Sequence, residues 1–177
     1  MHQEDFCQAL GIPPDMKYEK EGGPSLKQCA QLIRQYSLRP AADLKALLGW
    51  AVFNYLVGNA DAHGKNLSLL LSSKGVTLAP FYDLLCTAAY KNLTDRLAMR
   101  IGNEDRPEWV NRGQWEALAA DLDIKPKLVL STLTEMAKAA AAAVATFVFT
   151  DETGIVRGIR KIIRDRSRKV LTRLVSN

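Results

Sequence analysis

Three polar residues near the middle of the chain have types and spacings that could hold a metal ion and a phosphate. Asp61 and Asn66 lie five positions apart in a polar segment, and Asp83 follows a short stretch with the pattern of a hairpin. A carboxylate beside an amide oxygen is a hard, all-oxygen ligand pair that suits Mg2+, which keeps several waters and borrows phosphate oxygens. We therefore expect Asn66 and Asp83 to bind a metal, and Asp61 to face the group that the metal holds.

A hairpin is the element that would bring Asn66 and Asp83 together. Residues 67–72 and 76–79 are short apolar runs on either side of a turn signal at 73–75, which is typical of a hairpin. Asn66 and Asp83 are equidistant from its centre, and residues directly opposite in an antiparallel pair lie about 5 Å apart. The two side chains should therefore converge at the base of the hairpin.

The hairpin follows a helix that we expect at the centre of the fold. Apolar residues recur at helical spacing from Leu44 to Leu56, after Pro40, and further apolar side chains on the other faces indicate burial on most sides. This helix runs into the polar loop 58–66. We also expect a loop at 11–24, a helix capped by Ser25 and ending near Ser37, a short extended piece at 97–101, and helices at 111–122, about 126–149 and 155–174.

These elements predict one mainly α domain with a small β-hairpin, an α+β fold over residues 1–177. The 177 residues suffice for one hydrophobic core, and 47% apolar with 24% charged residues excludes disordered and fibrous classes. No stretch reaches the roughly 18 uninterrupted apolar residues of a membrane span. The three cysteines are too few and too far apart for a disulfide framework or a zinc site. We expect a cytoplasmic protein with no membrane partner.

The positive charge of the chain is concentrated in its last helix. Residues 155–177 carry eight basic residues and one acid, a net charge of +7, whereas the whole chain carries +5, so residues 1–154 carry −2. Apolar residues at helical spacing in the same segment indicate that one face docks on the body. The basic face is then either a solvated surface or a site for an anionic partner such as nucleic acid.

The order of these parts is that of protein kinases: core helix, loop with Asp and then Asn five residues later, hairpin, and a second Asp. Tyr82-Asp83-Leu84 stands where Asp-Phe-Gly is usual. The string Gly-Asn-x-Asp-x-His-x-Lys-Asn-x-Ser-Leu from Gly58, followed by Pro-x-Tyr-Asp-Leu from Pro80, resembles the HipA family of serine/threonine kinases. These are toxins of bacterial toxin–antitoxin pairs. The opening His2 to Gly11 and Lys17-Tyr18-Glu19 also resemble that family.

The resemblance implies a protein-kinase-like C-terminal lobe with a role for each motif residue. Its parts would be a catalytic loop at 58–66, a hairpin at 67–79, a metal motif at 80–84 and a helical part at 111–177. Asp61 would be the catalytic base, Asn66 and Asp83 would bind Mg2+ and orient the phosphates of ATP, and Asn59 would brace the loop. The nucleotide side would be lined by His63, Gly64, Lys65, Asn66, Tyr82 and Asp83.

A kinase also needs a lobe that covers the nucleotide. We find no glycine-rich run followed by a strand lysine upstream of Asp61, so the N-terminal ATP-binding lobe is expected to be absent. ATP binding would then be weak or absent, and the chain alone would be inactive without an N-lobe, which could be a separate chain. The chain could be a truncated gene product, a single domain or half of a split system. The resemblance further implies a helix-turn-helix antitoxin with its operator DNA as partners, and a protein substrate such as an aminoacyl-tRNA synthetase.

Two alternatives to a kinase lobe remain open. The first is a non-catalytic interaction module that binds an antitoxin-like partner and DNA through the basic C-terminal helix. The second is a zinc hydrolase using Asp61, His63 and Asp83, which is disfavoured because the only other histidine is His2 at the N-terminus.

Overall fold

The computed structural model describes residues 2–147 and 153–174. Within them the elements follow the order β1 (His2–Asp5), α1 (Phe6–Ala9), α2 (Leu26–Tyr36), α3 (Pro40–Val57), β2 (Ser68–Ser72), β3 (Gly75–Leu78), α4 (Arg112–Asp121), α5 (Pro126–Thr146) and α6 (Gly154–Lys169). Single 3-10 turns lie at Glu19–Glu21, Gly64–Asn66 and Thr87–Ala89, and a π turn at Val170–Leu174 continues α6. The expected mainly α fold with a small sheet is confirmed. Positions 148 and 149 of the helix predicted at 126–149 lie outside the described residues.

Local sequence signals explain where the helices begin and end. Ser25 caps α2 in a capping box, with its hydroxyl accepting from the Gln28 amide at 3.2 Å, as predicted. Pro40 occupies the first turn of α3, where its missing N–H costs nothing. Gly58 ends that helix in the left-handed region, at φ +82°. The chain therefore leaves α3 sharply, at the position where the catalytic loop was expected.

The sheet has three antiparallel strands in the order β1-β2-β3. The hairpin of β2 and β3 is confirmed, whereas β1 was not predicted. It pairs with β2 from His2 opposite Leu71 to Asp5 opposite Ser68. The strand His-Gln-Glu-Asp lacks the apolar alternation of a half-buried strand, so only its distant partner defines it. The extended piece expected at 97–101 has a single bridge, from Ile101 to Glu104, and is otherwise irregular.

The hairpin register differs from the predicted one. Leu69 lies opposite Leu78 and Ser72 opposite Gly75, so paired residue numbers add to 147 and the turn is centred on Ser73 and Lys74. Continuing this register places position 81, and not Asp83, opposite Asn66. The contact between Asn66 and Asp83 therefore depends on the irregular chain after β3.

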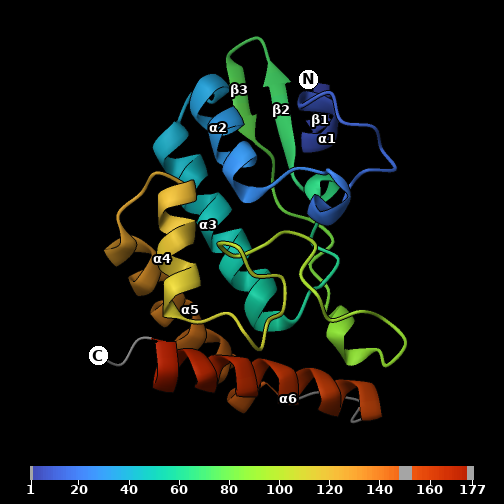
Figure 1. Cartoon of the computed structure of the whole chain (residues 1–177), viewed down its shortest axis with the longest axis vertical. Helices are drawn as coiled ribbons and strands as arrows, with labels where there is room; N and C mark the ends of the chain where they lie inside the picture. The colour runs from blue at the N-terminus through green and yellow to red at the C-terminus, as the bar shows by residue number, and fades with distance from the viewer. Residues whose placement is uncertain (1, 148–152, 175–177) are drawn as a thin grey trace.

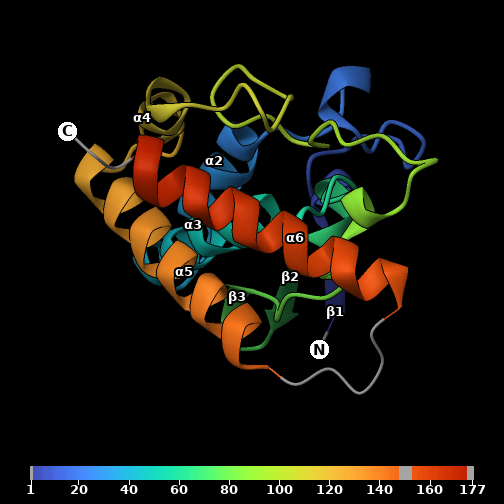
Figure 2. The same ribbon diagram turned by 90° about the horizontal axis from the view of Figure 1, so that it is seen from below.

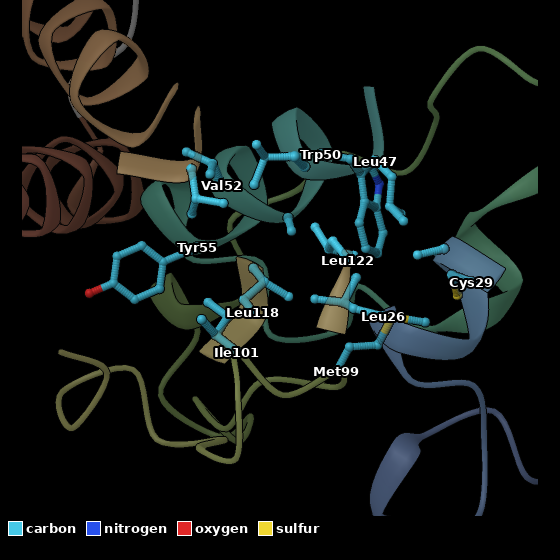
Figure 3. Packing of buried hydrophobic residues seen from close by; sticks show 14 of the residues in the cluster. Leu26, Cys29, Leu47, Trp50, Val52, Tyr55, Met99, Ile101, Leu118 and Leu122 are labelled. Atoms are coloured by element: carbon cyan, nitrogen blue, oxygen red, sulfur yellow. The ribbon is translucent and has the colours of Figure 1, made fainter. Parts of the chain in front are cut away.

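Helix α3 lies in the middle of the molecule. Figure 1 shows the sheet and α1 at one end and α6 across the other, and Figure 2, seen from below, shows α5 and α6 side by side in front of α3. Figure 3 shows α3 residues such as Leu47, Trp50 and Tyr55 facing residues of α2 and α4. Tyr55 and Trp115 pack edge to face at 5.3 Å between ring centroids. This rigid helix carries the polar loop at its C-terminal end.

Helix α5 is the one helix of the described residues whose length and composition would suffice to cross a membrane. Its mean hydropathy over the best window is 1.4, and 17% of that window is buried. Val129, Leu133 and Ala137 form its buried face, which packs in the helical core. Much of the remaining surface is alanine.

Candidate active site

The loop at 58–66 is held between α3 and the chain that follows the hairpin. Asn59 is 3% exposed, and its Nδ2 donates to Asn54 Oδ1 at 2.9 Å and to the Asp83 carbonyl at 3.1 Å. Its Oδ1 accepts from the Asp61 amide at 3.1 Å. One buried amide therefore ties α3, the loop and Asp83 together.

Asn66 and Asp83 come together at the base of the hairpin. Asn66 Nδ2 donates to Asp83 Oδ2 at 2.7 Å, and Asn66 Oδ1 accepts from the His63 amide at 2.9 Å. Asp83 is an exposed residue in the left-handed region, at φ +57°. This unusual backbone for a non-glycine residue turns the chain back to Asn66 after β3. The convergence inferred from the hairpin is confirmed, although the register behind it was wrong.

The pair offers what a magnesium site of two protein ligands needs. The carboxylate of Asp83 reaches solvent, and Asn66 Oδ1 keeps a second lone pair beside the one that accepts from His63. Mg2+ is commonly bound by one or two such ligands together with waters and substrate phosphates. The donor types therefore fit the ion, with the Asn66 oxygen, and not the nitrogen that contacts Asp83, as the ligand atom.

Asp61 is half-buried and has a partner that the sequence analysis did not identify. The hydroxyl of Tyr18, 43 positions earlier, donates to Asp61 Oδ1 at 2.6 Å. Partial burial is the largest cause that raises the pKa of Tyr18, and the hydrogen bond and charge of Asp61 add to it, to about 12. In the sequence Tyr18 belongs only to the family-like string Lys17-Tyr18-Glu19, and no local pattern links it to Asp61.

His63 lies inside the fold beside Asp61. It is 5% exposed, and its Nε2 lies 3.9 Å from Asp61 Oδ1. Its ring meets that of Tyr18 edge to face at 5.4 Å between centroids. Burial and the charge of Lys17 lower the pKa of His63, against the opposing pull of Asp61. In the described part of the chain, His63 Nδ1 is buried without a hydrogen-bond partner.

The other residues expected on the nucleotide side differ in exposure. Tyr82 is 40% exposed, and its hydroxyl donates to the Lys65 carbonyl and lies 3.0 Å from Ser68 Oγ. Gly64 is buried, and a Cβ there would come within 2.5 Å of Pro24 Cγ. Close packing therefore accounts for a glycine at this position without a ligand.

A pocket of about 320 Å³ opens beside Asp61. Its walls include Tyr18, Asp61, Thr87, Leu93 and Arg96. Thr87 supports the wall, because its Oγ1 accepts from the Ala60 amide at 2.7 Å. Asp61 therefore borders a space that could receive a side chain of another molecule.

The zinc alternative has no ligand set in residues 2–147 and 153–174. No group of three or more His, Cys, Asp or Glu side chains in these ranges is placed to hold a metal ion. The pair of Asn66 and Asp83 is of another kind, since one of its two members is an amide.

Six of the seven basic residues of α6 fall into two sets. Arg166 donates to the Tyr55 carbonyl, and Lys169 Nζ donates to the carbonyls of Pro107 at 2.9 Å and Glu108 at 2.8 Å. These two cations therefore dock the helix. An exposed stripe follows positions i, i+4, i+7 and i+11 on α6: Arg157, Lys161, Arg164 and Arg168. Asp165 pairs with two of these, Lys161 at 2.7 Å and Arg168 at 3.1 Å.

Comparisons with known proteins agree on one family. A family model described as HipA-like C-terminal domain matches residues 1–144. A putative kinase of Sinorhizobium fredii, Y4mE, is 48% identical over 145 residues, which cover 82% of this chain and 34% of the relative. The serine/threonine-protein kinase toxin HipA of Shewanella oneidensis is 34% identical over 157 residues, which cover 83% of this chain and 36% of that protein. The chain thus spans about a third of the length of these relatives.

A solved structure extends the similarity to the fold. It is the complex of HipA, HipB and operator DNA from the Shewanella oneidensis toxin–antitoxin system. Its matching chain has a TM-score of 0.88 and 31% sequence identity, and the match covers 98% of this chain and 44% of that one. The kinase-like C-terminal fold expected from the motifs is therefore confirmed.

Proposed function

The chain belongs to the HipA-like C-terminal domain family, and we propose that it supplies the catalytic part of a protein serine/threonine kinase. The observation that carries the proposal is the 2.7 Å hydrogen bond from Asn66 to Asp83, with Asn66 in the same loop as Asp61, which borders a pocket. Two metal ligands and a separate carboxylate beside a side-chain-sized pocket are the parts that phosphoryl transfer to a hydroxyl requires.

Each residue has a defined task in this reaction. Asp61 accepts the proton of the acceptor hydroxyl. The oxygen of that hydroxyl attacks the γ-phosphorus of ATP, and ADP leaves. Asn66 and Asp83 would hold Mg2+, which when bound neutralises phosphate charge. Asn59 holds the base and the metal-binding residue in place relative to each other, since it binds the Asp61 amide and the Asp83 carbonyl. The pocket beside Asp61 receives the acceptor residue of a protein substrate, for which an aminoacyl-tRNA synthetase is the expected class.

Transfer also needs a loop and a lysine that grip the phosphates, and we place these outside residues 1–177. Positioning and charge stabilisation supply most of the rate in phosphoryl transfer. We therefore expect the chain alone to bind ATP weakly and to transfer phosphate far below catalytic rates. A nucleotide lobe, on the same polypeptide or a separate one, would restore the activity.

Metal binding can be tested on the chain as it is. Mn2+ replaces Mg2+ at oxygen sites and broadens the NMR signals of nearby nuclei. With ATP present, Mn2+ should broaden the amide signals of Asn66 and Asp83 first, and Asp83→Asn should abolish this effect. Asp15→Asn, in an exposed loop, is the matched control. Broadening that is unchanged in Asp83→Asn would contradict the metal assignment.

Catalysis can be tested in a hybrid kinase. The part of Shewanella oneidensis HipA that matches this chain would be replaced by the chain itself. The hybrid should phosphorylate protein in an ATP-dependent manner, and Asp61→Asn should lower the rate by about 100-fold or more, the usual worth of a general base. A hybrid that binds Mg-ATP but is inactive, or an Asp61→Asn variant with full activity, would refute the proposal.

A second candidate function rests on the exposed stripe of α6. Four cations lie on one face, and Asp165 neutralises part of their charge. This face could contact DNA phosphates alongside an antitoxin. Binding of duplex DNA should then weaken steeply with salt, with a logarithmic slope of about −0.9 per phosphate contact. Arg157→Gln with Arg164→Gln should flatten the slope by up to about 2. A slope that does not change would remove α6 from the interface.

A further inference from the structure

We propose that Tyr18 is a positioning residue for Asp61: its phenol engages one carboxylate oxygen and leaves the other for the acceptor hydroxyl. The inference rests on the proposed function for the role of Asp61. The contact itself is independent of that role. No motif of the loop includes Tyr18, which reaches the site from the segment between α1 and α2.

The hydrogen bond has the length of a charge-assisted contact. The distance of 2.6 Å from the Tyr18 hydroxyl to Asp61 Oδ1 falls within the range typical of O–H donors to ionised carboxylates. A phenol has one proton to donate, so it can orient only one of the two oxygens. The ring of Tyr18 is itself packed edge to face on buried His63, at 5.4 Å. The Tyr18 side chain is therefore fixed both by the packing of its ring and by the hydrogen bond of its hydroxyl.

The backbone around Tyr18 is anchored on both sides. The Tyr18 carbonyl accepts from the Gly23 amide at 2.9 Å, and the Glu19 amide donates to the Ala98 carbonyl at 3.1 Å. The Glu19 carboxylate accepts from the Arg100 amide at 2.7 Å. A Cβ at Gly23 would lie 2.5 Å from a backbone oxygen, so only glycine permits this close turn. The segment is thus a fixed support rather than a loose loop.

Tyr18 and Asp61 lie together in the wall of the 320 Å³ pocket. A carboxylate that rotates freely about its last bond offers either oxygen in many directions. With Oδ1 engaged by the phenol, Oδ2 has a defined direction toward an incoming hydroxyl. Such preorganisation is the usual contribution of a residue that supports a catalytic base.

The charges around Tyr18 keep its hydroxyl a donor at neutral pH. Burial is the largest cause that raises the pKa of Tyr18, and the negative charges of Asp61 and Glu21 raise it further, to about 12. Lys17 Nζ and Lys20 Nζ lie 5.1 Å and 5.8 Å from the ring centroid, and their positive charges act in the opposite direction without reversing this shift. Tyr18 therefore remains protonated in the pH range where the kinase would work.

A titration of the chain tests the contact without any need for activity. Isotope-labelled tyrosine would report each phenol separately, with Tyr→Phe variants for assignment. The pKa of Tyr18 should be about 12 and should fall in Asp61→Asn. Tyr55 is a matched internal control: burial raises its pKa to about 12 as well, with Asp61 not among the causes, so it should not move. A normal pKa for Tyr18, or one indifferent to Asp61→Asn, would overturn the inference.

The hybrid kinase then tests the positioning role. Tyr18→Phe keeps the ring and removes the donor, and should lower kcat by about tenfold, the worth of one hydrogen bond to a charged group. The KM for ATP and the Mn2+ broadening at Asn66 should be unchanged. Tyr36→Phe, on the exposed end of α2, is the control. Unchanged or increased kcat in Tyr18→Phe would overturn the inference, the latter by indicating that Tyr18 competes with the acceptor. A hybrid inactive with the native residue would refute the proposed function, while the titration would still decide the contact.

Discussion

The loop at 58–66 and helix α6 use polar groups in opposite ways. In the loop, neutral amides satisfy one another: Asn59 joins Asn54 to the Asp83 carbonyl, and Asn66 joins His63 to the Asp83 side chain. In α6, cations donate to backbone carbonyls of the body, and Lys169 binds those of Pro107 and Glu108 in the chain before α4. Arg166 binds the Tyr55 carbonyl in the last turn of α3.

This difference in hydrogen bonding indicates that the loop positions side chains, whereas the cations of α6 attach a helix to the body. In the loop, the Asn59 amide binds both the Asp61 amide and the Asp83 carbonyl, so it holds the backbone beside two carboxylates. The Arg166 guanidinium lies near the negative end of the α3 dipole, which favours a cation there. We therefore expect the loop to respond sharply to single atoms, and α6 to respond mainly to the loss of docking cations.

The largest effect should come from Asn59→Ala. The change leaves buried partners on α3 and in the loop without hydrogen bonds, each of which costs about 1–3 kcal/mol. The free energy of unfolding should fall by about 2–4 kcal/mol, as measured by urea denaturation. Asn92→Ala, at an exposed position, should change it by less than about 0.5 kcal/mol. Equal effects of the two variants would show that the amide network does not hold the loop.

A smaller loss is expected for Arg166→Met. Methionine retains much of the packing volume but leaves the Tyr55 carbonyl without its donor and the Tyr55 ring without the guanidinium 5.4 Å from its centroid. The free energy of unfolding should fall by about 1–3 kcal/mol. The exposed neighbour Arg164, changed in the same way, should alter it by less than about 0.5 kcal/mol. A loss as large as that of Asn59→Ala would erase the proposed contrast between the regions.

The sequence predicted most of the elements, and one contact of the site. Ser25, Pro40 and Gly58 marked helix ends because capping is a local effect. Asn66 and Asp83 were expected to meet, since a hairpin links positions that are close in the sequence. That expectation succeeded in spite of an error in register, because the left-handed backbone at Asp83 returns the chain to Asn66.

What could not be predicted depends on distant partners. Strand β1 is a polar tetrapeptide that is extended only because β2 lies beside it. Tyr18 reaches Asp61 through folding alone, across 43 positions. The basic side chains of the last helix were expected on a face separate from the docking face. Arg166 and Lys169 instead donate to carbonyls of the body. In each case a tertiary contact, which no periodicity encodes, decides the role of the residue.

The smallest effect should be the pH dependence that His63 gives to the loop. Its pKa is lowered, chiefly by burial, from 6.5, so the unfolded chain binds a proton more readily than the folded one below that value. The stabilisation is present above about pH 6.5 and is lost as the pH falls toward the folded pKa. Because carboxylates also titrate in acid, the difference between wild type and His63→Gln isolates this histidine. The wild type should lose more stability than His63→Gln between about pH 7 and pH 5, whereas His2→Gln, on exposed β1, should follow the wild type. Parallel curves for all three would mean that burial does not hold His63 neutral, and the loop would then tolerate a charge beside Asp61.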